Sequence, residues 1–177
     1  MSNPFQLLGI EPSFAIDLKA AEEHHLNLSR ALHPDRHATA PRAERRETLN
    51  RAIAVNEAWR RIKNPISRAE ALLELAGIPA GEERRHGEDP EFLMEVMERR
   101  EALAEAIANR DLDRMSKLSQ TVAADKQAVE ARLGELFERL LSDRSEADEA
   151  ALVSGLGRLR FFQRFLDEAA AAEDELF

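Results

Sequence analysis

The chain has 177 residues, with 25 Lys and Arg against 34 Asp and Glu, and a formal net charge of −9. It contains no cysteine, which excludes disulfides and any cysteine-ligated zinc site or iron–sulfur cluster held by the chain itself. No apolar run approaches the roughly 18 to 20 residues of a membrane span, and no basic region followed by an apolar one opens the chain, so we expect a cytoplasmic protein without signal peptide or anchor.

The composition also favours one fold class. Tyrosine is absent, valine, isoleucine and threonine are scarce, and alanine, leucine, glutamate and arginine dominate, so we expect an all-α protein. Residues 1–76 carry 11 Lys and Arg against 10 Asp and Glu, whereas residues 77–177 carry 14 against 24. The acidic second part argues against nucleic acid as a partner, and the uneven charge indicates two surfaces with different partners.

The chain opens with signals for two helices. Asn3 followed by proline predicts an N-cap and a first helical residue, and Gly9 ends this short helix. Asp17 caps the next helix, whose apolar stripe includes His25. A metal site needs partners at fixed spacing, so we interpret His25 as a residue packed at the edge of the core rather than as a ligand.

The segment Leu32–Arg36 follows this second helix. Because proline lacks a backbone N–H and clashes with the preceding turn, Pro34 ends the helix and pushes His33 towards an extended conformation. Both flanks read as amphipathic helices with their apolar stripes turned away, so the loop presents His33, Pro34 and Asp35 outward.

Two helices are expected after this loop, over residues 42–63 and 66–76. The first carries an apolar face that includes Leu49, Trp59 and Ile62, and Pro65 closes it. Together with the helix before the loop it should form an antiparallel hairpin. Residues 77–87, which contain Gly, Pro and several charges, are interpreted as a linker.

The helix that Asp89 and Pro90 begin, and that Asn109 can end, has two distinct faces. Phe92, Val96, Leu103 and Ile107 share the core stripe. On the opposite face lie Met94, Met97, Glu98, Glu101 and Glu105, with Leu93 on the flank. Methionines aligned with carboxylates on the far face predict an exposed, adaptable, acidic-edged surface for another protein.

Two further helices complete a three-helix bundle over residues 88–177. Residues 112–141 carry a bundle stripe, and Ser145 caps the last helix with Asp148 at the third position. The core stripe of that helix includes Leu152, Leu156, Leu159 and Leu166. Phe161 falls close to the opposite side and is not explained by the bundle.

The tripeptide His33-Pro34-Asp35, between two such helices, resembles the J-domain signature. The stretches 55–65 (VNEAWRRIKNP) and 68–77 (RAEALLELAG) resemble the J-domain of the HscB family specifically, and the similarity continues at 91–95 (EFLME) and 158–162 (RLRFF). That family consists of co-chaperones for iron–sulfur cluster assembly. The resemblance implies a J-domain at 1–76, a linker at 77–87 and a client-binding three-helix bundle at 88–177.

The resemblance also implies residue roles. A heat-shock-70-class ATPase would be bound, and its ATP hydrolysis stimulated, through His33, Pro34, Asp35, Arg30 and Arg36. The iron–sulfur scaffold protein would be bound through Leu93, Met94, Met97, Glu98, Glu101, Glu105 and Phe161. His24 and His25 stand where relatives often carry arginine and an aromatic residue, which weakens the basic face of the J-domain. We expect a monomer that is not an enzyme, with no cofactor, no metal and neither nucleic acid nor membrane as partner.

Two alternatives remain. His33, Asp35 and His37 have ligand-capable side chains at alternate positions, so a metal-dependent hydrolase is conceivable, although all three come from one loop and no nucleophile motif accompanies them. Bound metal that is lost when His37 becomes alanine would favour it. The second alternative is a general J-domain co-chaperone for unfolded chains, but the Gly/Phe-rich stretch and cysteine-rich module of such proteins are absent.

Overall fold

The computed structural model describes residues 3–79 and 90–176, and every regular element within these ranges is a helix. The prediction of an all-α fold is therefore confirmed. The chain separates into two compact units, residues 1–79 and residues 80–177. No helix in the described ranges is long and apolar enough to cross a membrane.

The helices of the first unit begin where capping residues stand. Helix α1 (Pro4–Leu8) is capped by Asn3, whose Oδ1 accepts hydrogen bonds from the first free backbone N–H groups, and it ends at Gly9 with a φ of 67°. Asp17 caps α2 (Leu18–Ala31) in the same way. Asn64 caps α4 (Pro65–Leu75). Local chemistry thus sets these helix starts.

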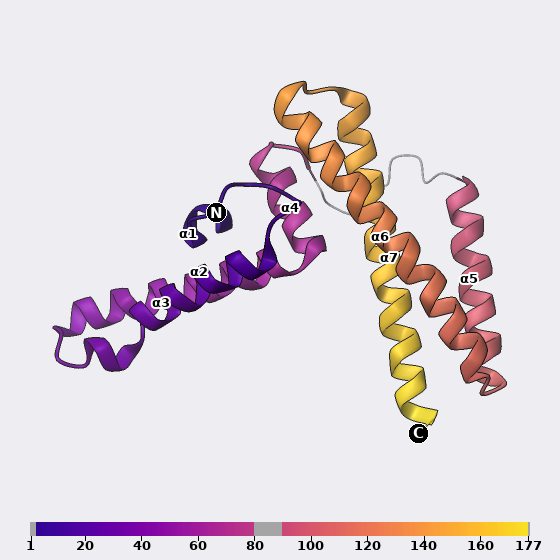
Figure 1. Ribbon diagram of the computed structural model, residues 1–177, viewed down its shortest axis with the longest axis horizontal. Coiled ribbons are helices and arrows are strands. Elements are labelled where there is room, and N and C mark those ends of the chain that lie inside the picture. The colour runs from indigo at the N-terminus through magenta and orange to yellow at the C-terminus, as the bar shows by residue number, and fades with distance from the viewer. Residues whose placement is uncertain (1–2, 80–89, 177) are drawn as a thin grey trace. The chain divides into compact units, whose positions relative to one another are not determined.

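An antiparallel hairpin of α2 and α3 (Arg42–Lys63) forms the long axis of the first unit, and α1 and α4 pack on α3 (Figure 1). The expectation that Leu49 belongs to the buried face of α3 is wrong, because its side chain is 51% exposed. In Figure 1 the first half of α3 lies beside α2 and away from α1 and α4, so this half is covered less fully than the second half, where Val55, Ala58 and Ile62 are buried. The buried apolar residues of the unit are Phe5, Leu8, Phe14, Ala21, Val55, Ala58, Ile62, Ala69, Ala71, Leu72, Leu73 and Ile78.

One charged side chain is buried in this unit. Arg68 of α4 is 7% exposed, and its Nη1 donates to the carbonyl oxygen of Ile62 at 3.0 Å. Its guanidinium carbon lies 4.9 Å from the ring centroid of Phe14. Hydrogen bonding and the aromatic face compensate in part for removing the charge from water.

The second unit consists of α5 (Pro90–Ala108), α6 (Leu112–Ser142) and α7 (Glu146–Leu176). Helices α6 and α7 run antiparallel with the most extensive contact in the molecule, and α5 packs against both (Figure 1). A buried cluster holds the three helices together: Leu103, Ala106, Met115, Val122, Phe161, Phe162, Phe165 and Ala169. The predicted three-helix arrangement is therefore present.

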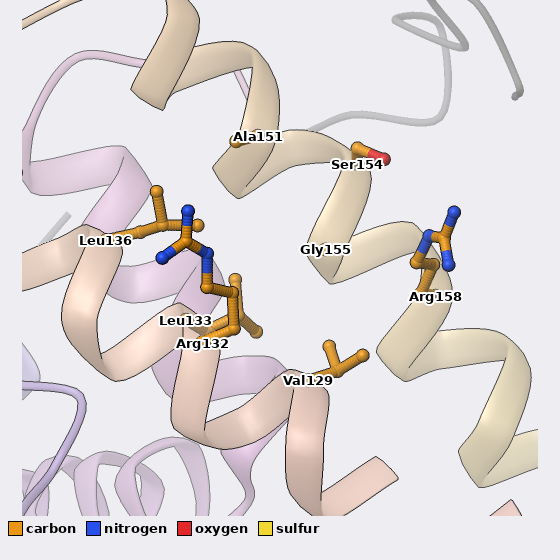
Figure 2. Close-up of a pocket in the computed structure, with 8 residues that line it drawn as sticks. All are labelled: Val129, Arg132, Leu133, Leu136, Ala151, Ser154, Gly155 and Arg158. Carbon is orange, nitrogen blue, oxygen red and sulfur yellow. The ribbon is translucent and has the colours of Figure 1, made fainter. Parts of the chain in front are cut away.

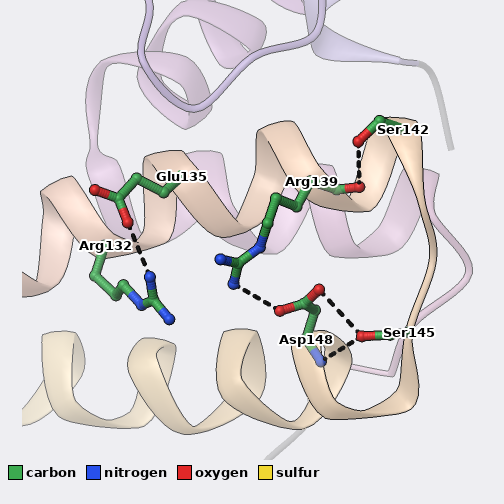
Figure 3. A network of polar contacts seen from close by, with 6 residues as sticks. All are labelled: Arg132, Glu135, Arg139, Ser142, Ser145 and Asp148. Carbon is green, nitrogen blue, oxygen red and sulfur yellow. Dashed lines mark hydrogen bonds and ion pairs between the residues drawn. The ribbon is translucent and has the colours of Figure 1, made fainter.

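A polar network stabilises the turn between α6 and α7 (Figure 3). The hydroxyl oxygen of Ser145 accepts from the backbone N–H of Asp148 at 3.1 Å and donates to the carboxylate of Asp148 at 3.0 Å. Arg139 of α6 donates to the same carboxylate at 2.7 Å. The predicted cap at Ser145 is confirmed, and Asp148 also ties the start of α7 to the end of α6.

The end of α5 differs in detail from the prediction. The helix stops at Ala108, but the residue in the left-handed region is Arg110, with a φ of 52°, rather than Asn109. The N–H of Asp111 donates to the carbonyl oxygen of Ala106 at 2.9 Å, which is typical of a left-handed helix end. The predicted cap at Asp89 and most of the predicted linker, residues 80–87, lie outside the described residues.

Candidate functional site

The His33-Pro34-Asp35 segment lies at the turn between α2 and α3. Helix α2 ends at Ala31, His33 is extended with φ −63° and ψ 134°, and residues Pro34–His37 form a short 3-10 helix, η1. Pro34 occupies the first position of that helix, where its missing N–H costs nothing. The segment predicted as a loop therefore contains a single turn of 3-10 helix.

The His33 side chain caps this turn. The backbone N–H of Asp35 donates to Nδ1 of His33 at 3.3 Å. The same Nδ1 lies 3.6 Å from a carboxylate oxygen of Asp35. The imidazole and the carboxylate are therefore held side by side by the backbone that joins them.

The turn is open to solvent, as the sequence predicts. The side chains of His33 and Asp35 are 58% and 90% exposed. Arg30, in the last turn of α2, and Arg36, in η1, are exposed as well. Within residues 3–79 and 90–176, no lysine or arginine pairs with Asp35, so its carboxylate is accessible to a cation supplied from outside.

Histidines on either side of the turn in the sequence hold its flanking segments together. The ring of His25 stacks on Trp59 of α3 with a centroid separation of 5.3 Å, and its Nε2 lies 2.9 Å from Oδ1 of Asn56. His25 is thus packed at the edge of the core, and the interpretation as a core-edge residue is confirmed. On the other side of the turn, Nε2 of His37 donates to the carbonyl oxygen of Ala31 at 3.0 Å, which ties η1 to the end of α2.

The positions of these side chains argue against a metal site formed by His33, Asp35 and His37. In the described part of the chain, no three His, Asp or Glu side chains gather closely enough to hold a metal ion. The Nε2 atom of His37 is engaged with the carbonyl oxygen of Ala31 rather than directed towards His33 and Asp35.

The outer face of α5 forms a second exposed surface, which we call the α5 outer face and define by Leu93, Met94, Met97, Glu98, Glu101 and Glu105. Met94 and Met97 are 63% and 71% exposed, and Leu93 is 38% exposed. Methionine is flexible and polarisable, so an exposed pair of methionines is suited to fitting an irregular apolar partner surface.

The carboxylates of this face differ in their surroundings. Glu105 pairs with Arg114 of α6 at 2.8 Å, and the two side chains are 59% and 41% exposed. Glu98 and Glu101 are exposed and form no ion pair with any described residue. The acidic edge next to Met97 is therefore available to a basic partner.

Phe161 does not belong to this exposed face. It is 6% exposed and lies in the core of the bundle, where its ring meets Phe92 of α5 edge to face at 5.8 Å. The expectation that the bundle leaves Phe161 unexplained is wrong, because α7 packs against both α5 and α6 and therefore buries two stripes. Phe161 stands behind the α5 outer face and supports it.

Two arginines that sequence reasoning missed hold α5 in position. Arg99 pairs with Asp125 of α6 and with Glu95, both at 2.5 Å. The guanidinium carbon of Arg158 in α7 lies 4.3 Å from the ring centroid of Phe92. The helical period places Arg99 beside the core stripe of α5, and this position alone could have indicated that Arg99 contacts a neighbouring helix.

Comparison with known proteins gives consistent findings. A family model described as the HSCB C-terminal oligomerisation domain matches residues 88–170. The chain is 34% identical over 175 residues to the co-chaperone protein HscB homolog of Shewanella halifaxensis, covering 99% of each chain. It is 34% identical over 172 residues to the homolog of Neisseria meningitidis, covering 97% of this chain and 99% of the other.

Solved structures agree with this comparison. The chaperone HscB from Vibrio cholerae superposes with a TM-score of 0.84 at 29% identity, covering 99% of this chain and 100% of the other. The human co-chaperone protein HscB superposes with a TM-score of 0.85 at 25% identity, covering 98% of this chain and 83% of that chain.

Proposed function

This chain belongs to the HscB family of co-chaperones, and we propose that it carries an iron–sulfur cluster scaffold protein to a heat-shock-70-class ATPase in the cytoplasm and stimulates ATP hydrolysis there. The observation that carries the proposal is the presence of two unlike exposed surfaces in two separate units. One is the His33-Pro34-Asp35 turn, and the other is the α5 outer face.

The turn is suited to docking on the ATPase. Asp35 presents a solvent-exposed carboxylate that can accept a charge-assisted hydrogen bond from an arginine of the partner. The proline ring and the cap from His33 fix the backbone, so little conformational entropy is lost on binding. Arg30 and Arg36 place positive charge on either side of the turn, which attracts an acidic partner surface.

The α5 outer face is suited to a folded client. Its apolar centre, Met94 and Met97, is flexible, while the helix beneath is held by the Arg99 ion pairs and by the ring contact between Phe92 and Phe161. Glu98 and Glu101 add a preference for basic residues on the client. Holding client and ATPase on one chain raises their effective concentration for each other.

The proposal assigns separate activities to separate residues, and two substitutions test this. Asp35→Asn keeps the shape of the side chain but removes its charge, so it should abolish stimulation of the ATPase and leave the affinity for purified scaffold protein unchanged. Met97→Ala should weaken scaffold binding by about tenfold, or roughly 1.4 kcal/mol, and leave stimulation by the chain alone unchanged. Steady-state ATP hydrolysis and calorimetric titration measure the two activities.

Matched controls sharpen this test. Glu44→Gln removes one exposed negative charge in the first turn of α3, outside the His33-Pro34-Asp35 turn, and should leave stimulation intact. Met97→Leu keeps an apolar side chain of similar size and should retain scaffold affinity. Unfolded protein should not compete with the scaffold, which separates this function from that of a general co-chaperone. Equal loss of both activities in both folded variants would refute the two-surface proposal.

A further inference from the structure

The sulfur atoms of this chain belong to four methionines, because cysteine is absent. Met1 lies outside the described residues. Met115 is 0% exposed and belongs to the core of the second unit, whereas Met94 and Met97 are the most exposed large apolar side chains in the described ranges. The accessible sulfur of the described residues therefore lies on the α5 outer face.

The groove between α6 and α7 offers a contrast within the same unit (Figure 2). Its apolar lining comes from Val129, Leu133 and Leu136, and no methionine lines it. Tyrosine is absent from the chain, and the single tryptophan, Trp59, lies in the first unit with its ring stacked on that of His25. A mild oxidant that reaches the described part of the second unit thus finds its reactive atoms on the α5 outer face.

Hydrogen peroxide converts an accessible methionine into methionine sulfoxide. The thioether sulfur attacks one oxygen of the peroxide, and an S–O bond forms as the O–O bond breaks. The proton of the transferred oxygen passes to the leaving hydroxide, which departs as water. The sulfur loses two electrons and the peroxide gains them. The side chain keeps its carbon skeleton but becomes polar and chiral at the sulfur.

This change alters what the α5 outer face can bind. Burying a hydrogen-bond acceptor without a donor is unfavourable, so an apolar client surface that fits Met94 and Met97 does not fit their sulfoxides. The bundle itself stays folded, because Met115 is buried and the two reactive side chains contribute little to the core. Oxidation therefore acts on binding and leaves the helices in place.

We propose that Met94 and Met97 form a reversible oxidation site, and that their conversion to sulfoxides by a peroxide releases the client protein. The inference rests on the proposed function, because it assigns a chemical control to the surface that holds the client. Methionine sulfoxide reductases, with a thiol reductant as electron donor, convert both sulfoxide epimers back to the thioether. The chain has no thiol or disulfide of its own, so this reduction alters no other side chain of the chain.

The first measurement locates the oxidation by peptide mass spectrometry of the full chain after treatment with hydrogen peroxide. The sulfoxide should form at Met94 and Met97 at least about tenfold faster than at Met115, because exposure governs access of the oxidant. Far-UV circular dichroism of the treated chain should keep the helical signal of the untreated chain. Equal rates at the three methionines, or loss of the helical signal, would overturn the inference.

The second measurement is calorimetric titration of purified scaffold protein into the treated chain after the peroxide has been removed. Treatment should weaken binding by about tenfold or more, and methionine sulfoxide reductases should restore it. In the double variant Met94→Leu with Met97→Leu, the affinities before and after treatment should agree within about twofold. The matched control is Met115→Leu, a swap of similar volume, which should lose affinity on treatment as the unaltered chain does.

The outcomes separate this inference from the proposed function. If the treated chain binds the scaffold as tightly as the untreated chain, the inference is overturned and the proposed function stands. If the double leucine variant loses as much affinity on treatment as the unaltered chain, the sensitive residue lies elsewhere, and the inference is overturned as well. If the untreated chain does not bind the scaffold, both are overturned.

Discussion

Phe161 gives the most direct test of how the bundle supports its exposed face. Replacing a buried phenylalanine by alanine typically costs about 3 to 5 kcal/mol, from lost burial and the cavity that remains. Phe161 is 6% exposed and contacts Phe92, Phe162 and Phe165. In a unit of this size each kcal/mol lowers the Tm by roughly 4 to 8 °C, so Phe161→Ala should lower the Tm of the bundle by at least about 12 °C.

The two units can be followed separately in this experiment. Trp59 is the only tryptophan and lies in α3, so its fluorescence reports unfolding of the first unit. Far-UV circular dichroism reports both units. We expect Phe161→Ala to shift the dichroism transition of the bundle and leave the fluorescence transition in place.

The matched control for this change is Met97→Ala, in the same unit. Met97 is 71% exposed, so its loss should change the free energy of unfolding by no more than about 0.5 kcal/mol. If Phe161→Ala lowers the Tm no more than Met97→Ala does, the assignment of Phe161 to the core is refuted. If the Tm measured by Trp59 fluorescence falls as much as the Tm measured by circular dichroism, the effect of the lost packing is not confined to the bundle.

Two further substitutions test local features by urea unfolding. A Cβ at Gly157 would meet open space, so Gly157→Ala should stabilise α7 by about 0.5 to 1 kcal/mol. A Cβ at Gly155 would lie 2.8 Å from Cδ2 of Leu133, so Gly155→Ala should leave the chain less stable than Gly157→Ala by about 1 to 3 kcal/mol. Equal stabilities of the two variants would contradict the close approach of Gly155 to Leu133. Asn64→Ala removes the α4 cap and should cost about 1 kcal/mol, seen in the Trp59 transition, and Asn64→Ser should restore most of it.

Much of the fold followed from local signals. The residues that begin and end helices act through their own backbone neighbours, so Asn3, Gly9, Asp17 and Pro65 could be interpreted without knowledge of the tertiary structure. The exposed face of α5 was also predictable, because a helix at the edge of a bundle buries one stripe and leaves Met97 on the other side.

The incorrect expectations concern residues whose surroundings come from distant parts of the chain. A single core stripe on α7 predicts Phe161 outside the core, whereas this helix contacts two others and buries it. The helical period also assigns Leu49 to the buried stripe of α3, but its side chain is half exposed, because α1 and α4 lie away from the first half of this helix. The helical period indicates on which face of a helix a side chain lies, but only the tertiary structure shows which other helices pack against that face.

The position of α1 has a consequence for the order in which the chain folds. Helix α1 leaves the ribosome before α3, yet α3 is its main partner and begins only at Arg42. The contact must therefore close a long loop, and closing long loops delays folding. Helices α6 and α7 are joined by the short turn around Ser145 and can pair as soon as both are made. Helix α1 can contact α2 earlier, but it must wait for α3 to be made before it gains its main packing partner.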